Sequence, residues 1–157
     1  MVEPDVGQRP SFDAVYRDLR PALIRTAFLI VGSTAEAEEL VQDAFVQLHQ
    51  RFEAIDAPAA YLRVALVRSC VRRNERRTME SDRLARMPSP ALAGEPAVDE
   101  MWSALRRLRP ERRAVLVLRF YEDLAHSEIA RLLDCPVATV RSRVRRALTD
   151  LRKELDR

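Results

Sequence analysis

The sequence predicts an all-α protein made of two small helical domains that are joined by a flexible linker. Three observations support this prediction. Apolar residues recur at spacings of three and four in several stretches, as they do on one face of an α-helix. A proline-rich segment separates two groups of such stretches. The chain has 157 residues, of which 47% are hydrophobic, so it can bury a substantial core.

The first helical pattern follows a short N-terminal tail. Residues 1–10 include proline and glycine and are predicted to form a flexible tail. Ser11 can cap a helix whose apolar residues recur up to Ile30, and Gly32 is expected to end that helix. Pro21 lies inside this pattern and is expected to kink or divide the helix, because proline removes a backbone hydrogen bond.

A second, acidic helix is predicted from about Thr34 to Arg51. Ser33 and Glu36 fit a capping box, in which the serine oxygen and the glutamate carboxylate accept hydrogen bonds from free amides. The predicted inward stripe of this helix is Leu40, Val41, Ala44, Phe45, Leu48 and Phe52. The residues that are predicted to point outward are Glu38, Glu39, Gln42, Asp43 and Gln47.

A third, basic helix is predicted from Pro58 to about Arg77, since proline is favoured in the first turn of a helix. Its arginines are predicted to point outward, and the three helices are predicted to share a core. Residues 78–97 contain several prolines and no sustained apolar period, so they are predicted to form a flexible linker. The inward residues of the third helix are Leu62, Ala65, Leu66, Ser69 and Cys70.

Helix formation is predicted to resume after the linker, at residues 97–107 and 111–121. The second stretch contains the continuous apolar run VLVLRFY at residues 115–121, whose length also allows a β-strand. A helix is the favoured prediction, because no neighbouring stretch offers a partner strand. This segment is expected to supply core residues to the helices that follow.

The last part of the chain, Ser127–Leu155, contains two helical patterns that meet at a short corner. Asp134 and Pro136 favour this corner, because aspartate tolerates a left-handed conformation and proline favours the first turn of a new helix. The layout is that of a helix-turn-helix in which the second helix is the recognition helix. Its predicted inward stripe is Val137, Val140, Val144, Leu148, Leu151 and Leu155.

The opposite face of the predicted recognition helix is basic. A row of charges is most often an ordinary solvated surface. Here Thr139 and Ser142 lie beside the arginines, and no acidic residue occurs in residues 137–149. Hydroxyl and guanidinium groups in this arrangement favour binding to base edges and phosphates in a major groove. The arginines of this face are Arg141, Arg143, Arg145 and Arg146.

The composition argues against several other classes of function. The formal net charge is only +3, so a nucleic-acid surface must come from segregated charge; residues 34–56 are mainly acidic and residues 61–77 mainly basic. The two cysteines and two histidines have no metal-ligand spacing, so no metal and no cofactor is predicted. No nucleophile–base pair or glycine-rich phosphate loop occurs, so the chain is not predicted to be an enzyme.

The remaining features of the chain concern its location and its cysteines. No apolar run approaches the roughly 20 residues of a membrane-spanning helix, and the N-terminus lacks the pattern of a signal peptide. We therefore expect a cytoplasmic protein without direct membrane insertion. Cys70 and Cys135 are expected to be small buried hydrophobic residues rather than redox sensors.

Together these features resemble the extracytoplasmic function (ECF) group of the bacterial sigma-70 family. Residues 12–77 resemble sigma region 2, with AEELVQDAF at residues 37–45 and YLRVALVRS at residues 61–69. Residues 98–155 resemble region 4, where the corner, the apolar spacing and the arginine row agree in order. The resemblance implies a tail at 1–10, a three-helix region 2 at 11–77, a linker at 78–97 and a four-helix region 4 at 98–157.

The resemblance also implies contacts with core RNA polymerase. In region 2 of such factors, an acidic-Leu-Ile/Val-Gln-acidic motif binds the clamp helices of the β′ subunit. In this chain the motif is Glu39, Leu40, Val41, Gln42 and Asp43. The polymerase β flap is a second expected partner. Without the resemblance, the polar residues of this motif would be interpreted as a solvated face.

Two sites for promoter DNA are implied as well. Residues that fall where the family melts and binds the non-template strand of the −10 element are Tyr61, Arg63, Arg68, Arg72 and Arg73. Arginines along a helix, together with an aromatic ring, suit single-stranded DNA. Residues that fall where the family contacts the −35 element are Thr139, Arg141, Ser142, Arg145 and Arg146.

Two positions depart from the pattern of the family. Arg68 stands where the family often has an asparagine that is associated with a flipped −10 base, and Tyr61 stands where tryptophan is commoner. The resemblance still implies that these residues bind DNA, but it implies no preference for a particular −10 sequence. A structural alternative is that Arg68 pairs with a nearby acid such as Glu75 and does not contact DNA.

The predicted function is that of an RNA polymerase sigma factor, which binds core polymerase and directs promoter recognition and transcription initiation. The resemblance further implies a separate anti-sigma factor that covers the polymerase-binding faces. The alternative is a stand-alone helix-turn-helix regulator whose N-terminal helices dimerise or sense a ligand. Binding of the purified protein to core polymerase distinguishes the two.

Overall fold

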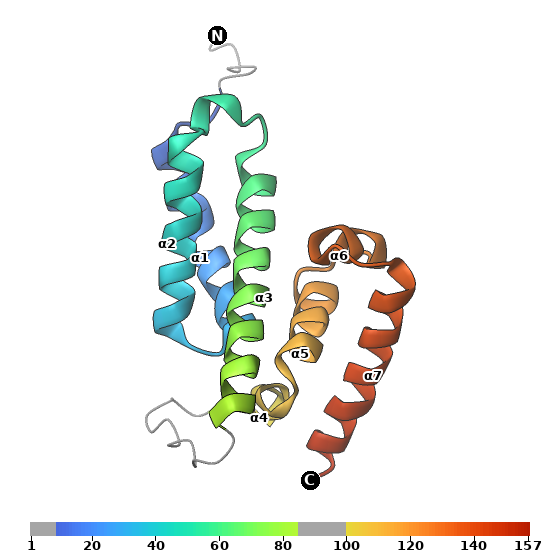
Figure 1. The fold of residues 1–157 in the computed structure, drawn as a ribbon. Helices are drawn as coiled ribbons and strands as arrows, with labels where there is room; N and C mark the ends of the chain where they lie inside the picture. The colour runs from blue at the N-terminus through green and yellow to red at the C-terminus, as the bar shows by residue number, and fades with distance from the viewer. Residues whose placement is uncertain (1–8, 85–99) are drawn as a thin grey trace.

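The computed structural model describes residues 9–84 and 100–157, which form two groups of helices (Figure 1). No strand occurs in these residues, so the all-α prediction is confirmed and the strand alternative for residues 115–121 is wrong. The first group is α1 (Phe12–Val31), α2 (Thr34–Gln50), the 3-10 turn η1 (Phe52–Ala54) and α3 (Pro58–Leu84). The second group is α4 (Glu100–Arg107), α5 (Pro110–Leu116), the π-helical turn η2 (Val117–Tyr121), α6 (His126–Leu133) and α7 (Val137–Leu155).

Helix α1 has the ends that its sequence predicts. The Ser11 hydroxyl accepts a hydrogen bond from the backbone amide of Ala14 at 3.2 Å. At the other end, Gly32 adopts a left-handed conformation with φ of 79° and donates its amide to the carbonyl of Phe28 at 2.7 Å. Pro21 lies within α1, which continues through it as one helix, so the expected division does not occur.

Helix α2 buries most of the stripe that was expected to face inward and exposes the residues that were expected to face outward; Phe52, the last residue of the expected stripe, lies in η1 and is only partly buried. Leu40, Val41, Ala44, Phe45 and Leu48 are all buried. The Ser33 hydroxyl accepts from the Glu36 amide at 3.4 Å, as in a capping box. The Glu36 carboxylate instead pairs with Arg73 and Arg77 of α3, so it links α2 to the basic helix.

Helix α3 continues to Leu84, beyond its expected end at Arg77. Residues 78–84 were predicted to begin the linker, and that part of the prediction is wrong. They contain no proline or glycine, so nothing in the sequence ends the helix there. The rest of the expected linker, residues 85–97, lies outside the described residues.

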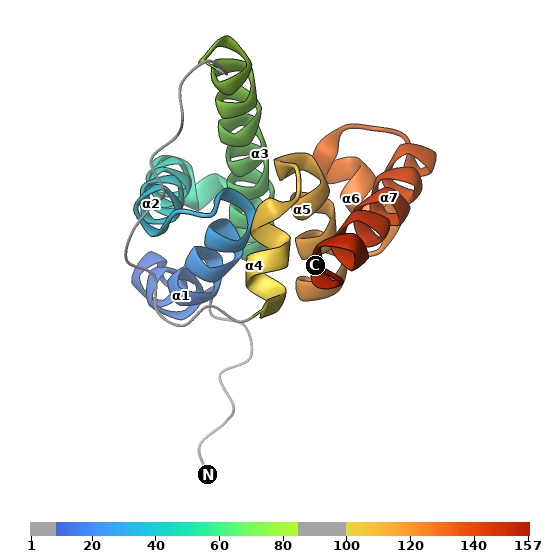
Figure 2. The same cartoon turned by 90° about the horizontal axis from the view of Figure 1, so that it is seen from below.

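The apolar run of α5 and η2 lies between the two groups of helices. Figures 1 and 2 show α5 between α3 and α7, and α5 packs against α1, α3 and α7. Residues 114–118 are all buried, which explains why the run lacks the polar face of a surface helix. One hydrophobic core therefore extends through both groups.

The helix-turn-helix has the predicted corner between α6 and α7. Asp134 adopts the left-handed conformation with φ of 50°, and the next amide, of Cys135, donates to the carbonyl of Ala130 at 3.0 Å.

On α7, the prediction that Leu148 faces inward is wrong, because Leu148 is 40% exposed and Ala147 is fully buried. Alternating steps of four and three residues keep Val140, Val144 and Ala147 on one face of a 3.6-residue helix.

A buried arginine joins the second group of helices to the first. Arg113 of α5 is only 6% exposed, and its Nε and Nη2 atoms donate to the carbonyl of Ile30 on α1 at 3.2 and 2.8 Å. Burial, followed by repulsion from Arg77 and Arg106, lowers the pKa of Arg113 to about 10. The side chain therefore remains a cation at neutral pH, and carbonyl oxygens stabilise its charge.

No helix in the described part of the chain combines the length and the hydropathy that a membrane crossing requires.

Replacing Arg113 should destabilise the fold more than replacing its neighbour Arg112. Arg113→Ala removes buried, charge-assisted hydrogen bonds and leaves a cavity, so the free energy of unfolding in urea should fall by about 2–4 kcal/mol. Arg113→Lys should not restore it, since an ammonium group lacks the fork that guanidinium provides.

Arg112→Ala is the matched control for this prediction. Arg112 pairs with Asp150 near the surface, so its replacement should lower the free energy of unfolding by less than about 1 kcal/mol. Equal losses for the two alanine variants would show that Arg113 does not join the groups of helices as described.

Candidate nucleic-acid interface

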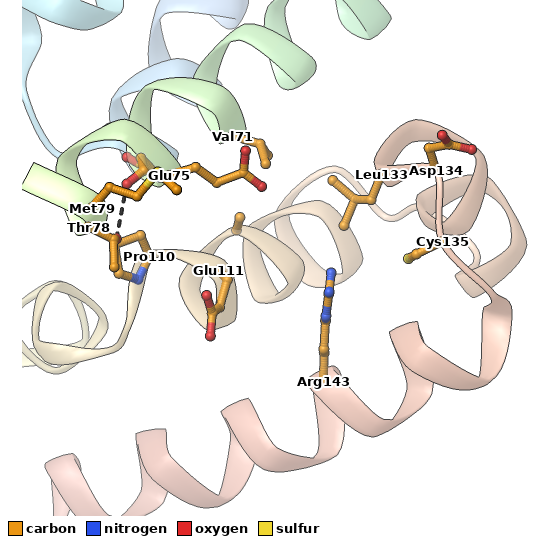
Figure 3. Close-up of a pocket in the computed structure, with 12 residues that line it drawn as sticks. Val71, Glu75, Thr78, Met79, Pro110, Glu111, Leu133, Asp134, Cys135 and Arg143 are labelled. Carbon is orange, nitrogen blue, oxygen red and sulfur yellow. Dashed lines mark hydrogen bonds between the residues drawn. The ribbon is translucent and has the colours of Figure 1, made fainter. Parts of the chain in front are cut away.

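The arginines of α7 are divided between solvent and the protein interior. Arg141, Arg145 and Arg146 are exposed, and Thr139 and Ser142 beside them are partly exposed. Arg143 is partly buried and extends from α7 into a cavity on its α5 side (Figure 3). The side chains available to a major groove are therefore those of the expected −35 set, and Arg143 is separated from them.

The cavity into which Arg143 extends has a volume of about 480 Å³ and lies between α3, α5 and the α6–α7 corner. Its walls combine apolar side chains with the carboxylates of Glu75, Glu111 and Asp134 (Figure 3). Asn74 also lines the cavity, and its buried Oδ1 atom has no hydrogen-bond partner in the structure. None of the expected DNA-binding residues lines this cavity, so it is separate from both candidate DNA sites.

The expected −10 residues lie along α3, and most of them already contact other parts of the protein. Arg63 forms an ion pair with Glu122 at 3.8 Å, and Tyr61 packs partly buried against the core. Arg73 pairs with Glu39 at 3.1 Å and with Glu36 at 3.6 Å. No hydrogen bond or ion pair joins the Arg72 guanidinium to another described residue, and Arg72 is exposed.

Arg68 contacts the helix-turn-helix rather than an acid. Its Nε atom donates to the carbonyl of Leu132 at 3.2 Å, and its Nη2 atom donates to the carbonyl of Arg131 at 3.4 Å. Both carbonyls belong to the last turn of α6. The proposed pairing of Arg68 with Glu75 is therefore not found in this structure.

The acidic face of α2 is accessible except at its leucine. Glu39, Gln42 and Asp43 are exposed, and Glu39 accepts a hydrogen bond from Arg73. Leu40 is only 5% exposed and packs into the core, so it can position the polar residues but offers a partner little surface. The polar members of the expected polymerase-binding motif thus share one accessible face.

The structure adds two residues to the site that were not predicted. Glu122 pairs with Arg63 and accepts a hydrogen bond from the Thr26 hydroxyl of α1, and Arg113 contacts the end of the same helix. In the sequence, Arg113 directly precedes the apolar residues 114–118, and a charged residue next to such a run is a possible sign of a buried polar contact. No local pattern marks Glu122, because its partners are far away in the sequence.

Both cysteines lie within the described residues, and neither forms a disulfide. Burial raises the pKa of the Cys70 thiol to about 12, so the thiol stays protonated at neutral pH. Cys135 is partly buried, and both cysteines are free thiols. Within residues 9–84 and 100–157, no cluster of histidine, cysteine, aspartate and glutamate could hold a metal ion.

Comparison with known proteins matches both halves of the chain. The family model for Sigma-70 region 2 matches residues 15–78, and the model for Sigma-70, region 4 matches residues 99–151. The RNA polymerase sigma-E factor of Streptomyces coelicolor is 30% identical, over 96% of this chain and 89% of the relative. The ECF RNA polymerase sigma factor SigE of Mycolicibacterium smegmatis is also 30% identical, over 96% of this chain and 64% of the relative.

A solved structure has the same fold. The sigma factor RpoE from Bartonella quintana, crystallised with the anti-sigma factor NepR, superposes with a TM-score of 0.69. The superposition covers 92% of this chain and 96% of that one, at 22% sequence identity. At this identity the likeness establishes the fold, which agrees with the all-α arrangement described above.

Proposed function

Because this chain belongs to the ECF group of the sigma-70 family and is an RNA polymerase sigma factor, we propose that its two helical groups divide the work of promoter recognition. Residues 11–77 act as region 2, which binds core polymerase and the −10 element. Residues 98–157 act as region 4, which binds the −35 element. The division is supported by the order of the two family matches, with the helix-turn-helix in the second.

The −35 element is proposed to be read by the exposed face of α7. Arg141 and Arg145 lie one turn apart, so both guanidinium groups can enter one major groove. A guanidinium fork matches the O6 and N7 acceptors of guanine, whereas hydroxyl groups bind bases or phosphates. Arg146, Thr139 and Ser142 complete this contact surface.

The −10 element is proposed to bind along α3. Its arginines supply positive charge that follows a phosphate backbone, and Tyr61 supplies an aromatic ring at the start of the helix. Arg72 is the most accessible of these arginines in the structure. Arg63, Arg68 and Arg73 would exchange their present oxygen partners for phosphate oxygens.

Core RNA polymerase is proposed to bind the exposed face of α2 through its β′ clamp helices. Glu39, Gln42 and Asp43 present acidic and amide groups that suit a basic partner. Region 4 is proposed to contact the β flap. In this role the chain supplies binding and positioning, and it needs no catalytic residue and no cofactor of its own.

An anti-sigma factor is proposed as a further partner, and the cytoplasm as the place of action. The Bartonella sigma factor with the same fold was crystallised with its anti-sigma factor. The exposed acidic face of α2 is suited to be covered by such a protein.

The observation that carries the proposal is the presence of both sigma regions in one chain, with exposed arginines on the recognition helix. Transcription reactions with core polymerase and genomic DNA, with and without the purified protein, test it directly. Sequencing of transcript starts should show new starts that share two upstream elements. Starts that are identical without the protein would contradict the proposed function.

Reversing the charge of the α2 face should weaken binding to core polymerase. The double variant Glu39→Lys, Asp43→Lys replaces two exposed acids with bases, so repulsion from a basic partner should reduce the affinity at least about tenfold. The fold should persist, because exposed charges contribute little to stability. Affinity can be measured by fluorescence anisotropy with labelled protein and unlabelled core enzyme.

A control for this experiment makes the same charge change elsewhere. Glu53→Lys, Asp56→Lys also replaces two exposed acids of the first helical group, outside the motif. This control should bind core polymerase as the wild type does. Equal weakening by both double variants would assign the effect to net charge and not to the α2 face.

Removing one exposed arginine of α7 should change promoter use according to sequence. Arg141→Ala should lose a base contact, and each bidentate arginine–guanine contact contributes roughly 1–3 kcal/mol of discrimination, or about 5- to 150-fold. Transcription from a promoter library randomised at the −35 element should therefore lose its preference at one position.

Arg143→Ala is the matched control on the same helix, because Arg143 points toward the cavity instead of solvent. It should retain the −35 preference of the wild type. A uniform reduction across all library promoters with Arg141→Ala would reassign that residue to phosphate binding.

A further inference from the structure

We propose that the cavity between α3, α5 and the α6–α7 corner is a binding site for a small organic cation, namely an aliphatic amine with two ammonium groups. The ammonium groups contact the acidic side chains of the cavity, and the methylene chain lies on its apolar wall. The site is separate from both proposed DNA sites and from the α2 face. This inference therefore goes beyond the proposed function and does not depend on it.

The cavity has the size and the walls of a small-molecule site. Its volume of about 480 Å³ falls within the range of roughly 300–1,000 Å³ that ligand pockets occupy. Apolar side chains from α3, α5 and the end of α6 form part of its wall, among them Val71, Pro110 and Leu133 (Figure 3). A methylene chain placed against these side chains leaves water, and the burial of each methylene group favours binding.

The charged side chains around the cavity favour a cation. Glu75 of α3, Glu111 of α5 and Asp134 at the corner supply three carboxylates, whereas Arg143 is the one basic residue in the lining (Figure 3). The lining therefore carries two net negative charges. Among the residues that the structure describes, no ion pair or side-chain hydrogen bond involves any of these three carboxylates. Two ammonium groups neutralise this lining, and a dianion of the same length is repelled by it.

A buried acceptor in the cavity wall lacks a donor. Asn74 is only 4% exposed, and its Nδ2 atom donates to the carbonyl of Ile30 at 3.0 Å, which fixes the orientation of the side-chain amide. Its Oδ1 atom has no hydrogen-bond partner among the described residues. A buried acceptor without a partner destabilises a protein, and an ammonium group has N–H donors where a carboxylate has none. The unpaired amide oxygen therefore favours the same class of ligand as the charges do.

Cys135 is a chemical reporter for occupancy of the cavity. It lines the cavity and is partly buried, whereas Cys70 is fully buried and lies outside the lining. Burial raises the pKa of the Cys70 thiol to about 12, so iodoacetamide should react with Cys135 in preference to Cys70. A ligand in the cavity covers Cys135. The rate of Cys135 alkylation, followed by mass spectrometry of peptides, therefore reports binding at this place in the full-length protein.

Hexamethylenediamine is the probe for this experiment. Its charge-reversed control is suberate, which has carboxylates at the two ends of the same methylene chain. We expect the diamine to bind with a Kd of about 1 mM or below, which a ligand of so few atoms can reach. At a concentration of about ten times the Kd, it should slow the alkylation of Cys135 about tenfold by mass action. Suberate at the same concentration and ionic strength should leave the rate unchanged.

Variants of the lining should change the Kd of the diamine in opposite directions. The double variant Glu75→Gln, Glu111→Gln should raise it about fivefold, as expected for the loss of two partly exposed charge pairs. Arg143→Gln removes a repulsive charge and should lower it about threefold, a gain that a loss of folding cannot produce. Glu38→Gln, Glu80→Gln is the matched control, because it removes two exposed acids of α2 and α3 outside the lining, and it should bind as the wild type does. Each Kd is taken from the concentration dependence, so a change in the reactivity of the thiol itself does not enter it.

Four results would overturn the proposal. An unchanged alkylation rate at about 10 mM diamine would show that the cavity does not bind it. Equal protection by suberate would show that the cavity does not select cations. Equal weakening by the two double variants would assign the effect to the overall acidity of the protein. Weaker binding by Arg143→Gln would show that the arginine takes part in holding the ligand, which a dication does not allow.

Discussion

The carbonyl groups at the end of α1 fix how the two halves of this protein fit together. The last turn of α1 contains no basic residue, so its free carbonyls require donors from elsewhere. Ile30 accepts hydrogen bonds from Asn74 of α3 and from Arg113 of α5, and Val31 accepts one from Arg77. Three helices thus meet at one helix end, and the orientation of α5 follows from it.

The contacts between the halves differ in strength. Arg113 is buried, and hydrogen bonds from charged groups contribute about 1.5–3 kcal/mol each. The Arg63–Glu122 pair lies near the surface, where an ion pair contributes about 0–1 kcal/mol. The position of α5 is therefore determined mainly by the buried contacts, and the Arg63–Glu122 pair adds little to it.

Local features of the sequence were sufficient to predict most helices and their buried faces. Ser11 caps a helix with its hydroxyl, and Gly32 and Asp134 end helices with a left-handed backbone, so these local roles can be recognised without the fold. The end of α3 was predicted too early, because the boundary was placed at the end of the arginine-rich stretch and not near the first helix-breaking residue, Pro88. The partners of Arg113 and Arg68 could not be predicted, because each depends on the packing of helices far apart in the chain.

The basic surfaces of α3 and α7 show why arginine content alone does not define a DNA site. Every guanidinium group needs oxygen partners, either from water, from nucleic acid or from the protein itself. On α7 the helical period separates exposed Arg141 from Arg143 at the cavity, although both belong to one arginine row. On α3 the partners of Arg68 are carbonyl oxygens of the helix-turn-helix. Since phosphate and carbonyl oxygens satisfy the same donors, an arginine row in a sequence does not by itself tell which of the two partners its guanidinium groups bind.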